Sequence, residues 1–426
     1  MPTTTALNVL LLAQFYPPVI GGEERHVQAL ARGLAERGHR VTVATLRVPG
    51  APESEIDRGV RIERLPGTMQ RFGALYQSDR RLAAPLPDPE TAIAMGRLIS
   101  RVKPQLVHAH NWMVHSYLPF AVTRRRPLLL SLHDYGQVCA KKTLIYRDES
   151  LCSGPAFEKC LRCAGRHYGP MKGVATVAAV WSTAAAARAL VDMFLPVSTA
   201  VADGNRLKDD RLPHRVVPNF IPDELPDGVA DPEVLAGLPS EGYLLFVGAF
   251  ARRKGVEVLL DAYRRLAHAP PLVMIGYRSS DDIPALDALP ANVLTFTEWP
   301  ADAVAEAWRR SRMGIVPSTW GDPCPTVVIE AMAAGKAVIG TRIGGMVDLV
   351  KDGETGILVP PADAGALARA IERLMLDQDR LKQMGAAAGT RSWKYRASAV
   401  VGRIEEAYRE LIDRRSVQTP ASEVEA

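Results

Sequence analysis

The most chemically suggestive stretch of the sequence is GDPCPTVVIEAMAAG, at residues 321–335. It contains two carboxylates eight residues apart, Asp322 in a proline-rich turn and Glu330 in an apolar run. A charge in apolar surroundings is unfavourable unless a partner compensates it. Ligand hydroxyls are one such partner, as for the acidic residue that binds a ribose in dinucleotide folds. The alternative is that Asp322 only caps a helix and Glu330 contacts a neighbouring lysine.

The same stretch predicts a helix over about residues 326–334, because Pro325 is suited to a first helical turn. The first amides of a helix have no partner within it. Those of Thr326, Val327 and Val328 are therefore expected to bind an anion. An anion site flanked by two hydroxyl-binding carboxylates fits a nucleoside diphosphate sugar.

A second candidate anion site lies in LLFVGAFARRKGVEVLL, where a predicted strand leads through a basic loop into a predicted helix. Arg252, Arg253 and Lys254 form the loop, and Gly255 permits a close turn into the helix. Cations beside a helix N-terminus suit a phosphate. A solvated basic loop is the alternative, and the 321–335 stretch favours the phosphate site.

In the first half of the chain, Gly21 and Gly22 separate a strand from a helix and would let backbone approach a phosphate. His133 ends another predicted strand, where it would either hydrogen-bond an acceptor hydroxyl or cap the sheet edge. His108 and His110 alternate on a strand and are expected to face the same acceptor side. An H-x-H metal site is disfavoured, because no acidic third ligand is evident nearby.

Four of the five cysteines fall in one segment of the first half. A tetrahedral structural zinc site needs four ligands and often includes a C-x-x-C pair, and both are provided by Cys139, Cys152, Cys160 and Cys163. Free thiols are the alternative. Disulfides are disfavoured in a cytoplasmic protein. Cys324 stands apart and is interpreted as a small buried apolar residue.

Short apolar runs alternate with helical patterns along the whole chain, which predicts an α/β fold with parallel sheets. The predicted strands are residues 7–13, 40–46, 105–110, 127–133 and 193–198, then 243–250, 271–277, 292–297, 312–318, 337–341 and 356–361. A helix is predicted over residues 22–37. The apolar stretch after residue 173 is interpreted as a packed helix and a strand, because Arg188 and Asp192 interrupt it.

We expect two doubly wound domains, because 426 residues exceed one ordinary core. The predicted domains are residues 1–220 and 241–395, joined by a Pro- and Gly-rich linker at 221–240. A last helix over 396–415 is expected to pack back on the first domain, and residues 416–426 are expected to be a disordered tail.

Composition indicates a globular protein, with 47% hydrophobic and 23% charged residues. A net charge of +5 favours an anionic small ligand or an acidic surface over a nucleic acid. We predict a cytoplasmic protein. Arg124, Arg125 and Arg126 form a basic group that suits either an anionic inner membrane face or simply a solvated loop.

These motifs together resemble the retaining GT-B glycosyltransferases, and most closely glycosyltransferase family 4. The matching features, in the family's order over nearly the whole chain, are the Gly21–Gly22 pair, VPNF at 217–220, RKG at 253–255, the carboxylates at 322 and 330, and IGGMVDLVKDGETGILVPPAD at 343–363. The resemblance implies two Rossmann-like domains facing across a cleft, with a nucleoside diphosphate sugar held mainly by the second.

The resemblance also implies roles for single residues. Lys254 and a neighbouring arginine would neutralise the diphosphate, Glu330 would hold the ribose, and Asp322 would contact the donor sugar. His133 would serve the reaction, and the glycine pair would approach the diphosphate. The family is thought to retain the anomeric configuration by front-face return and needs no metal for catalysis.

Two positions depart from the family pattern. The first acidic position is usually Glu and is Asp322 here, and an arginine is often found where this chain has Ala249. Arg252 or Arg253 would then replace that arginine. A nucleotide-sugar epimerase and a non-catalytic nucleotide-sugar-binding protein are the alternative functions. The donor, and an acceptor belonging to a polysaccharide, a glycolipid or a small molecule, stay open.

Overall fold

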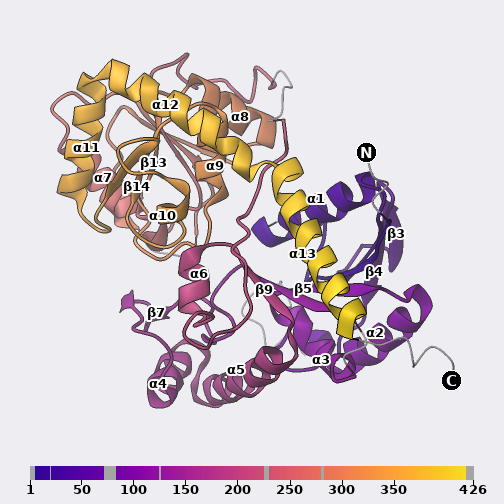
Figure 1. The fold of residues 1–426 in the computed structure, drawn as a ribbon. Coiled ribbons are helices and arrows are strands. Elements are labelled where there is room, and N and C mark those ends of the chain that lie inside the picture. The colour runs from indigo at the N-terminus through magenta and orange to yellow at the C-terminus, as the bar shows by residue number, and fades with distance from the viewer. Residues whose placement is uncertain are drawn as a thin grey trace, which may run out of the picture. The chain divides into compact units, whose positions relative to one another are not determined.

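The computed structural model describes residues 5–19, 21–71, 83–123, 126–224, 230–279 and 283–418. The chain divides into two compact units, one of residues 1–218 with 400–426 and one of residues 219–399. Each unit has its own parallel sheet, as the α/β pattern predicts. Figure 1 shows the order of the elements along the chain.

The first unit contains a seven-stranded sheet in the order β3-β4-β2-β1-β5-β6-β9. Its strands are β1 (Asn8–Leu12), β2 (Arg40–Leu46), β3 (Ser54–Asp57), β4 (Val60–Leu65), β5 (Leu106–His110), β6 (Leu128–Leu132) and β9 (Met193–Pro196). Only the β3–β4 pair is antiparallel. Leu12 pairs with Ala44 and Ala109, so the carboxyl ends of β1, β2 and β5 share one edge.

The apolar patterns predict five of these strands and miss β3 and β4, whose sequences SEID and VRIERL carry charges instead of an apolar run. Helix α1 (Gly22–Glu36) follows β1 and packs on the sheet through Val27, Leu30 and Leu34, which are fully buried. Gly38, with φ +87°, follows its C-terminal turn, a conformation that favours glycine.

Further helices described in the first unit are α2 (Pro89–Val102), α3 (Leu118–Ala121), α4 (Phe157–Tyr168), α5 (Pro170–Leu190) and α6 (Thr199–Gly204). A small hairpin of β7 (Ile145–Tyr146) and β8 (Ser150–Leu151) lies between β6 and α4. The predicted packed helix followed by a strand corresponds to α5 and β9.

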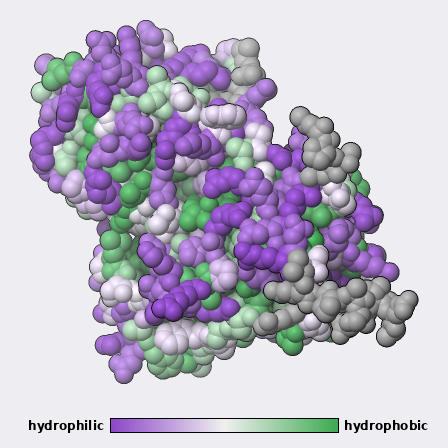
Figure 2. Space-filling view, in the orientation of Figure 1, coloured by the Kyte–Doolittle hydropathy of each residue, from purple (hydrophilic) through white to green (hydrophobic). Residues whose placement is uncertain are grey.

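Helix α5 is the one helix in the described part of the chain that is long and apolar enough to cross a membrane, by length and composition only. About 39% of its most apolar window is buried within the structure. Figure 2 shows hydrophobic residues along the lower edge of the drawn face, over α5. The predicted membrane contact of Arg124–Arg126 and the cytoplasmic location stay predictions, and Arg124 and Arg125 lie outside the described residues.

The second unit contains a six-stranded parallel sheet in the order β12-β11-β10-β13-β14-β15. Its strands are β10 (Leu244–Val247), β11 (Leu272–Gly276), β12 (Val293–Thr297), β13 (Met313–Val316), β14 (Val338–Thr341) and β15 (Gly356–Val359). All six strands agree with the predicted ones. Its helices are α7 (Val256–Arg264), α8 (Ala301–Arg310), α9 (Thr326–Ala333), α10 (Met346–Leu349), α11 (Ala364–Leu376) and α12 (Gln378–Ser392).

One expectation about the second unit is wrong, namely that a helix follows every strand. Between β11 and β12 the described residues contain only a 3₁₀ turn, Pro284–Leu286. The core of the unit lies between the sheet and helices α7 and α11, with Phe246, Leu259 and Ile371 among its buried residues.

The last helix, α13 (Ala397–Gln418), contributes to the first unit from Val400 onward. Tyr408 is fully buried there, and Arg415 forms an ion pair with Asp192 at 2.9 Å. The helix includes residues 416–418, where a disordered tail was expected, and residues 419–426 lie outside the described part.

Candidate active site

In the second unit, the basic loop is a 3₁₀ turn, Arg252–Lys254, that leads directly into α7. Gly255 adopts φ +76° at the start of that helix, and an added Cβ would overlap the carbonyl oxygen of Pro317. Glycine is therefore required on two counts, because the backbone is left-handed and because the segment after β13 passes close by. This close approach brings Lys254 to the turn that contains Asp322.

Lys254 and Asp322 form a direct ion pair between Nζ and Oδ2. The aspartate side chain is 9% exposed and the lysine side chain is 26% exposed. The backbone of the turn is held by Gly345, whose amide donates to the Asp322 carbonyl oxygen at 2.8 Å. The carboxylate partner in this structure is therefore the lysine, so a ligand of Asp322 would have to share or displace that contact.

The two arginines of the turn have different surroundings. Arg252 is exposed, with its guanidinium 3.8 Å from the carboxylate of Glu257. Arg253 lies over the ring of Trp320, with 5.8 Å between its guanidinium carbon and the ring centroid. Arg253 is thus beside the turn of Asp322. Ala249 is buried at 6% exposure.

Helix α9 begins at Thr326 after Pro325, as predicted, and ends beside Gly335, which has φ +68°. One of the three amides expected to be available is not, because Val328 donates to the Pro325 carbonyl oxygen at 3.1 Å. The amides of Thr326 and Val327 have no hydrogen-bond partner within the described residues. The anion cradle predicted from this helix is therefore smaller by one donor.

Glu330 is half-buried in the second turn of α9, between the buried Ile329 and Ala331. A loop containing Gly344 and Gly345 packs on the turn before the helix, since a Cβ at Gly345 would overlap the carbonyl oxygen of Pro323. The second unit thus brings together the loop at 252–255, the turn at 321–325 and the start of α9.

In the first unit, Gly21 is the N-cap of α1 in an extended conformation, and Gly22 is the first helical residue. A Cβ at Gly22 would meet nothing within 4 Å. The chain itself therefore does not require glycine at position 22. The predicted close approach of a ligand would occur at this start of α1.

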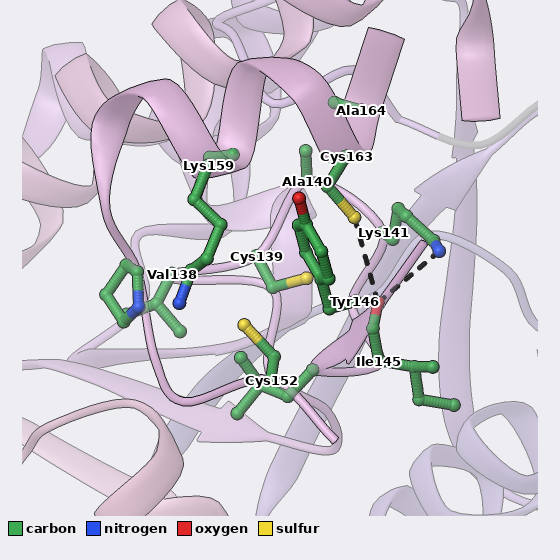
Figure 3. Close-up of a pocket in the computed structure, with 13 residues that line it drawn as sticks. Val138, Cys139, Ala140, Lys141, Ile145, Tyr146, Cys152, Lys159, Cys163 and Ala164 are labelled. Atoms are coloured by element: carbon green, nitrogen blue, oxygen red, sulfur yellow. Dashed lines mark hydrogen bonds between the residues drawn. The ribbon is translucent and has the colours of Figure 1, made fainter. Parts of the chain in front are cut away.

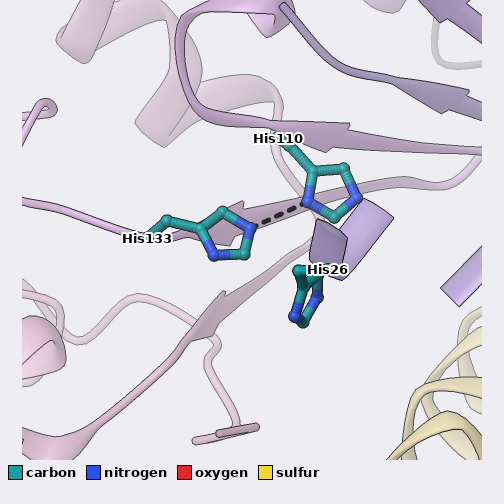
Figure 4. A group of neighbouring side chains, drawn as sticks. All are labelled: His26, His110 and His133. Carbon is teal, nitrogen blue, oxygen red and sulfur yellow. Dashed lines mark hydrogen bonds between the residues drawn. The ribbon is translucent and has the colours of Figure 1, made fainter. Parts of the chain in front are cut away.

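Three histidines from three elements meet beside this helix start (Figure 4). His26 belongs to α1, His110 ends β5 and His133 follows β6, and one ligand atom from each lies within 4.8 Å of the others. Nδ1 of His110 is 2.9 Å from Nε2 of His133. Nε2 of His110 is buried and has no hydrogen-bond partner among the described residues.

Burial, and then the neighbouring imidazoles, hold the pKa values of His26 and His110 well below their usual range. Both rings are therefore neutral at pH 7, which is the metal-binding form of histidine. The neighbours of His110 are two histidines from other elements, and not the acidic third ligand considered for an H-x-H site. Of that pair, only His110 takes part.

His108 does not face an acceptor side, contrary to expectation. It is completely buried, with Nδ1 2.7 Å from the Tyr408 hydroxyl and Nε2 2.8 Å from the Ser131 hydroxyl. Burial lowers its pKa to about 3. Its contacts join β5, β6 and α13, so its role is structural.

Glu23 is a candidate residue that sequence analysis missed. Its carboxylate accepts a hydrogen bond of 2.7 Å from Asn111, whose own side-chain oxygen accepts from the His133 amide at 3.3 Å. Burial raises its pKa to about 7, with Lys142 opposing that shift. A carboxyl group that titrates near neutrality is suited to proton transfer. The only available signal was its position directly after Gly21–Gly22.

The four clustered cysteines also lie in the first unit, as free thiols around one small cavity (Figure 3). Cys324 is buried in the second unit at 5% exposure, as expected. The cavity is separate from the histidines, although the chain connects them directly, since Cys139 follows His133 by six residues.

The fold is that of the GT-B glycosyltransferases. Sucrose-phosphate synthase from Thermosynechococcus elongatus matches with a TM-score of 0.71 and 22% identity, over 95% of this chain and 99% of that one. The HepE protein of Anabaena in complex with UDP-glucose matches with a TM-score of 0.66 and 16% identity, over 95% and 100% of the two chains. At these identities the likeness concerns the fold.

Family models assign the chain more narrowly. The model for Glycosyltransferase Family 4 matches residues 20–225, and the model for Glycosyl transferases group 1 matches residues 241–377. Together the two matches take in more than half of the sequence. The chain belongs to the glycosyltransferases of this group 1, family 4 type.

Curated relatives agree with this assignment. The chain is 27% identical to D-inositol 3-phosphate glycosyltransferase from Acidothermus cellulolyticus, over 94% of this chain and 88% of the relative. A shorter match, 39% identical, is to an exopolysaccharide phosphotransferase from Streptomyces coelicolor. It spans 27% of this chain and only 12% of that much longer relative.

Proposed function

We propose that this glycosyltransferase moves a sugar from a nucleoside diphosphate to an acceptor hydroxyl with retention of the anomeric configuration. The observation that carries the proposal is the meeting of Lys254 with the Asp322 turn beside the start of α9. This brings together an ammonium group and two amides that have no hydrogen-bond partner among the described residues. Such a set suits a diphosphate.

The proposed roles in the second unit follow from charge. Lys254 exchanges its contact with Asp322 for an oxygen of the departing diphosphate, and Arg253 adds a second cation from above Trp320. The amides of Thr326 and Val327 contribute fixed donors, which stabilise developing charge without reorganisation. Glu330 accepts hydrogen bonds from the ribose, and the released Asp322 carboxylate accepts from a sugar hydroxyl.

The first unit would bind the acceptor and handle its proton. His133 is half-buried and is aligned by His110 and by the amide contact with Asn111. Glu23 is joined to the same asparagine and titrates near neutrality. Gly22 leaves room for a ligand beside Glu23.

Retention would follow from front-face return, in which the leaving phosphate helps to deprotonate the acceptor. The proposal uses side chains and backbone amides for charge stabilisation and invokes no catalytic metal. A complex of HepE with UDP-glucose supports the donor class. The names of the relatives favour acceptors in inositol-containing or exopolysaccharide products.

The first test is a thermal-shift screen with nucleotide sugars, in which a bound donor raises the melting temperature by mass action. Transfer assays with the preferred donor then compare the wild type with Lys254→Met and Glu330→Gln. We expect each variant to lose at least ~100-fold in turnover, the magnitude typical of a lost charge-stabilising contact. The product's anomeric configuration, measured by NMR, tests retention.

Two further variants keep the test interpretable. Lys254→Met leaves the Asp322 carboxylate without its ion pair, so Lys254→Met/Asp322→Asn removes both charges together. Lys351→Met removes an exposed lysine of the same unit and should act like the wild type. Near-normal turnover by Lys254→Met or Glu330→Gln would contradict the proposed site. Conversion of the donor sugar without an acceptor would instead indicate an epimerase. Donor binding without any transfer would indicate a non-catalytic binding protein.

A further inference from the structure

The cysteine cavity of the first unit is formed by four sulfur-bearing residues from three separate pieces of chain (Figure 3). Cys139 lies in the loop after β6, Cys152 directly follows β8, and Cys160 and Cys163 lie three residues apart on α4. The cavity has a volume of about 30 Å³. A cavity of this size has room for a bound ion.

Backbone amides are directed at the sulfur atoms, as they are at metal-bound thiolates. The Arg147 amide donates to Sγ of Cys163 at 3.3 Å. The amides of Lys141, Thr143 and Leu144 approach Sγ of Cys139. N–H groups directed at sulfur in this way would satisfy the lone pairs of a metal-bound thiolate. A merely apolar packing of cysteines would not need this arrangement.

The surrounding charges also fit a bound anionic complex. A zinc ion with four thiolates carries a net charge of −2, and Lys141 and Lys159 both line the cavity. The Lys141 side chain is only 3% exposed and is paired with Asp148. Its ammonium group also donates to the Ile145 carbonyl oxygen at 3.4 Å, next to the sulfur of Cys163.

We propose that Cys139, Cys152, Cys160 and Cys163 bind one structural zinc ion in this cavity. Zinc–sulfur bonds of about 2.3 Å in a tetrahedron place the sulfur atoms ~3.8 Å apart. The four thiols are not grouped as compactly as the imidazoles of His26, His110 and His133, so metal binding draws them closer together. The cysteines are nevertheless the better zinc site, because four thiolates complete a closed tetrahedron and a cavity already lies between them.

The zinc would fix the loop that begins at His133. In this loop the Tyr135 amide donates to the Lys142 carbonyl oxygen at 3.2 Å, and Lys142 lies 4.0 Å from the ring centroid of Trp112. The indole nitrogen of that tryptophan donates to the Gly136 carbonyl oxygen at 3.0 Å. A metal at Cys139 would therefore hold the histidine end of the loop as well. An effect of the zinc on sugar transfer through His133 rests on the proposed function, whereas zinc binding itself does not.

The test measures metal in the full-length protein, purified without chelators, by inductively coupled plasma mass spectrometry. We expect about one zinc per wild-type chain and almost none in the variant Cys160→Ser/Cys163→Ser. Cys324→Ser is the matched control, because that cysteine belongs to the second unit, and it should keep its zinc. Cobalt substitution should give the intense visible absorption of a tetrahedral thiolate site in the wild type and the control only.

Several results would overturn the proposal. These are a wild-type zinc content near zero, disulfide-bonded cysteines in the purified protein, stoichiometric iron in place of zinc, or unchanged zinc in the double variant. Thermal unfolding separates this inference from the proposed function. The double variant should melt at a lower temperature yet keep its stabilisation by a nucleotide sugar, since the donor site lies in the second unit. A metal-free wild type that still transfers sugar would refute the zinc site alone.

Discussion

Lys254 and Asp322 are 68 residues apart in sequence and form a direct ion pair in the folded protein. Spacing alone indicated a ligand for each of them separately. The pair explains how a carboxylate at 9% exposure is tolerated while no sugar is bound. Under the proposed function, donor binding would exchange one partner of the ammonium group for another.

At the residue scale, the raised pKa of Glu23 should make the protein's free energy of unfolding depend on pH. Its folded pKa is about 7, above the ordinary value of 4.5. As the pH rises from 4.5 to 7, the unfolded chain loses this proton and the folded chain keeps it, so the free energy of unfolding falls. Glu23→Gln removes the effect, and we expect it to be more stable than the wild type at pH 8 by roughly 3 kcal/mol. Urea denaturation between pH 4 and 8 measures the difference.

The difference should vanish near pH 4, where both states of the wild type bind the proton. Glu36→Gln, at the exposed end of the same helix, is the control and should follow the wild-type curve. A constant difference between Glu23→Gln and the wild type at every pH would show that the carboxyl is not held protonated by burial.

At the scale of elements, the passage from β10 through the basic turn into α7 depends on Gly255. Gly255→Ala would place a methyl group against the Pro317 carbonyl and strain a left-handed residue. We expect a loss of more than ~2 kcal/mol in the free energy of unfolding. The displaced Lys254 should also weaken donor binding, measured by titration calorimetry.

Gly242→Ala separates the two causes. Gly242 also has a positive φ, +84°, but an added Cβ there would meet nothing within 4 Å. We expect a cost of only about 1 kcal/mol, from the backbone conformation alone, and unchanged donor binding. Equal effects of the two substitutions would show that the close approach to Pro317 does not position the lysine.

At the scale of the whole molecule, the first unit depends on a helix from the far end of the chain. Deleting residues 400–426 removes six buried side chains, Val400, Val401, Ile404, Ala407, Tyr408 and Leu411. Their burial is worth on the order of 10 kcal/mol, which is comparable with the total stability of a domain. We expect the first unit to unfold, leaving one calorimetric transition from residues 219–399.

Deleting residues 419–426 is the control, because it retains the whole of α13 and should leave both transitions in place. The long deletion should still show stabilisation by a nucleotide sugar if the second unit holds the donor. A first unit that melts cooperatively at its usual temperature without α13 would contradict this dependence.

Local patterns were sufficient for most of the elements. Apolar runs and glycine positions predicted eleven strands, the start of α9 and the helix after Gly22. They failed for the edge strand β3 and for its neighbour β4, because charged residues interrupt the apolar run in both and pairing with adjacent strands stabilises them. They also failed for the amide of Val328, whose bond to Pro325 depends on how tightly the first turn closes.

The sequence by itself determined the α/β class, the cationic turn at 252–254, the carboxylates at 322 and 330 and the cysteine group, because residue type and local spacing carry that information. The tertiary structure alone decided that Lys254 meets Asp322, that His26 and His133 join His110, and that Glu23 titrates near neutrality. These facts depend on contacts between distant segments and on burial. A one-dimensional pattern contains neither until the chain has folded.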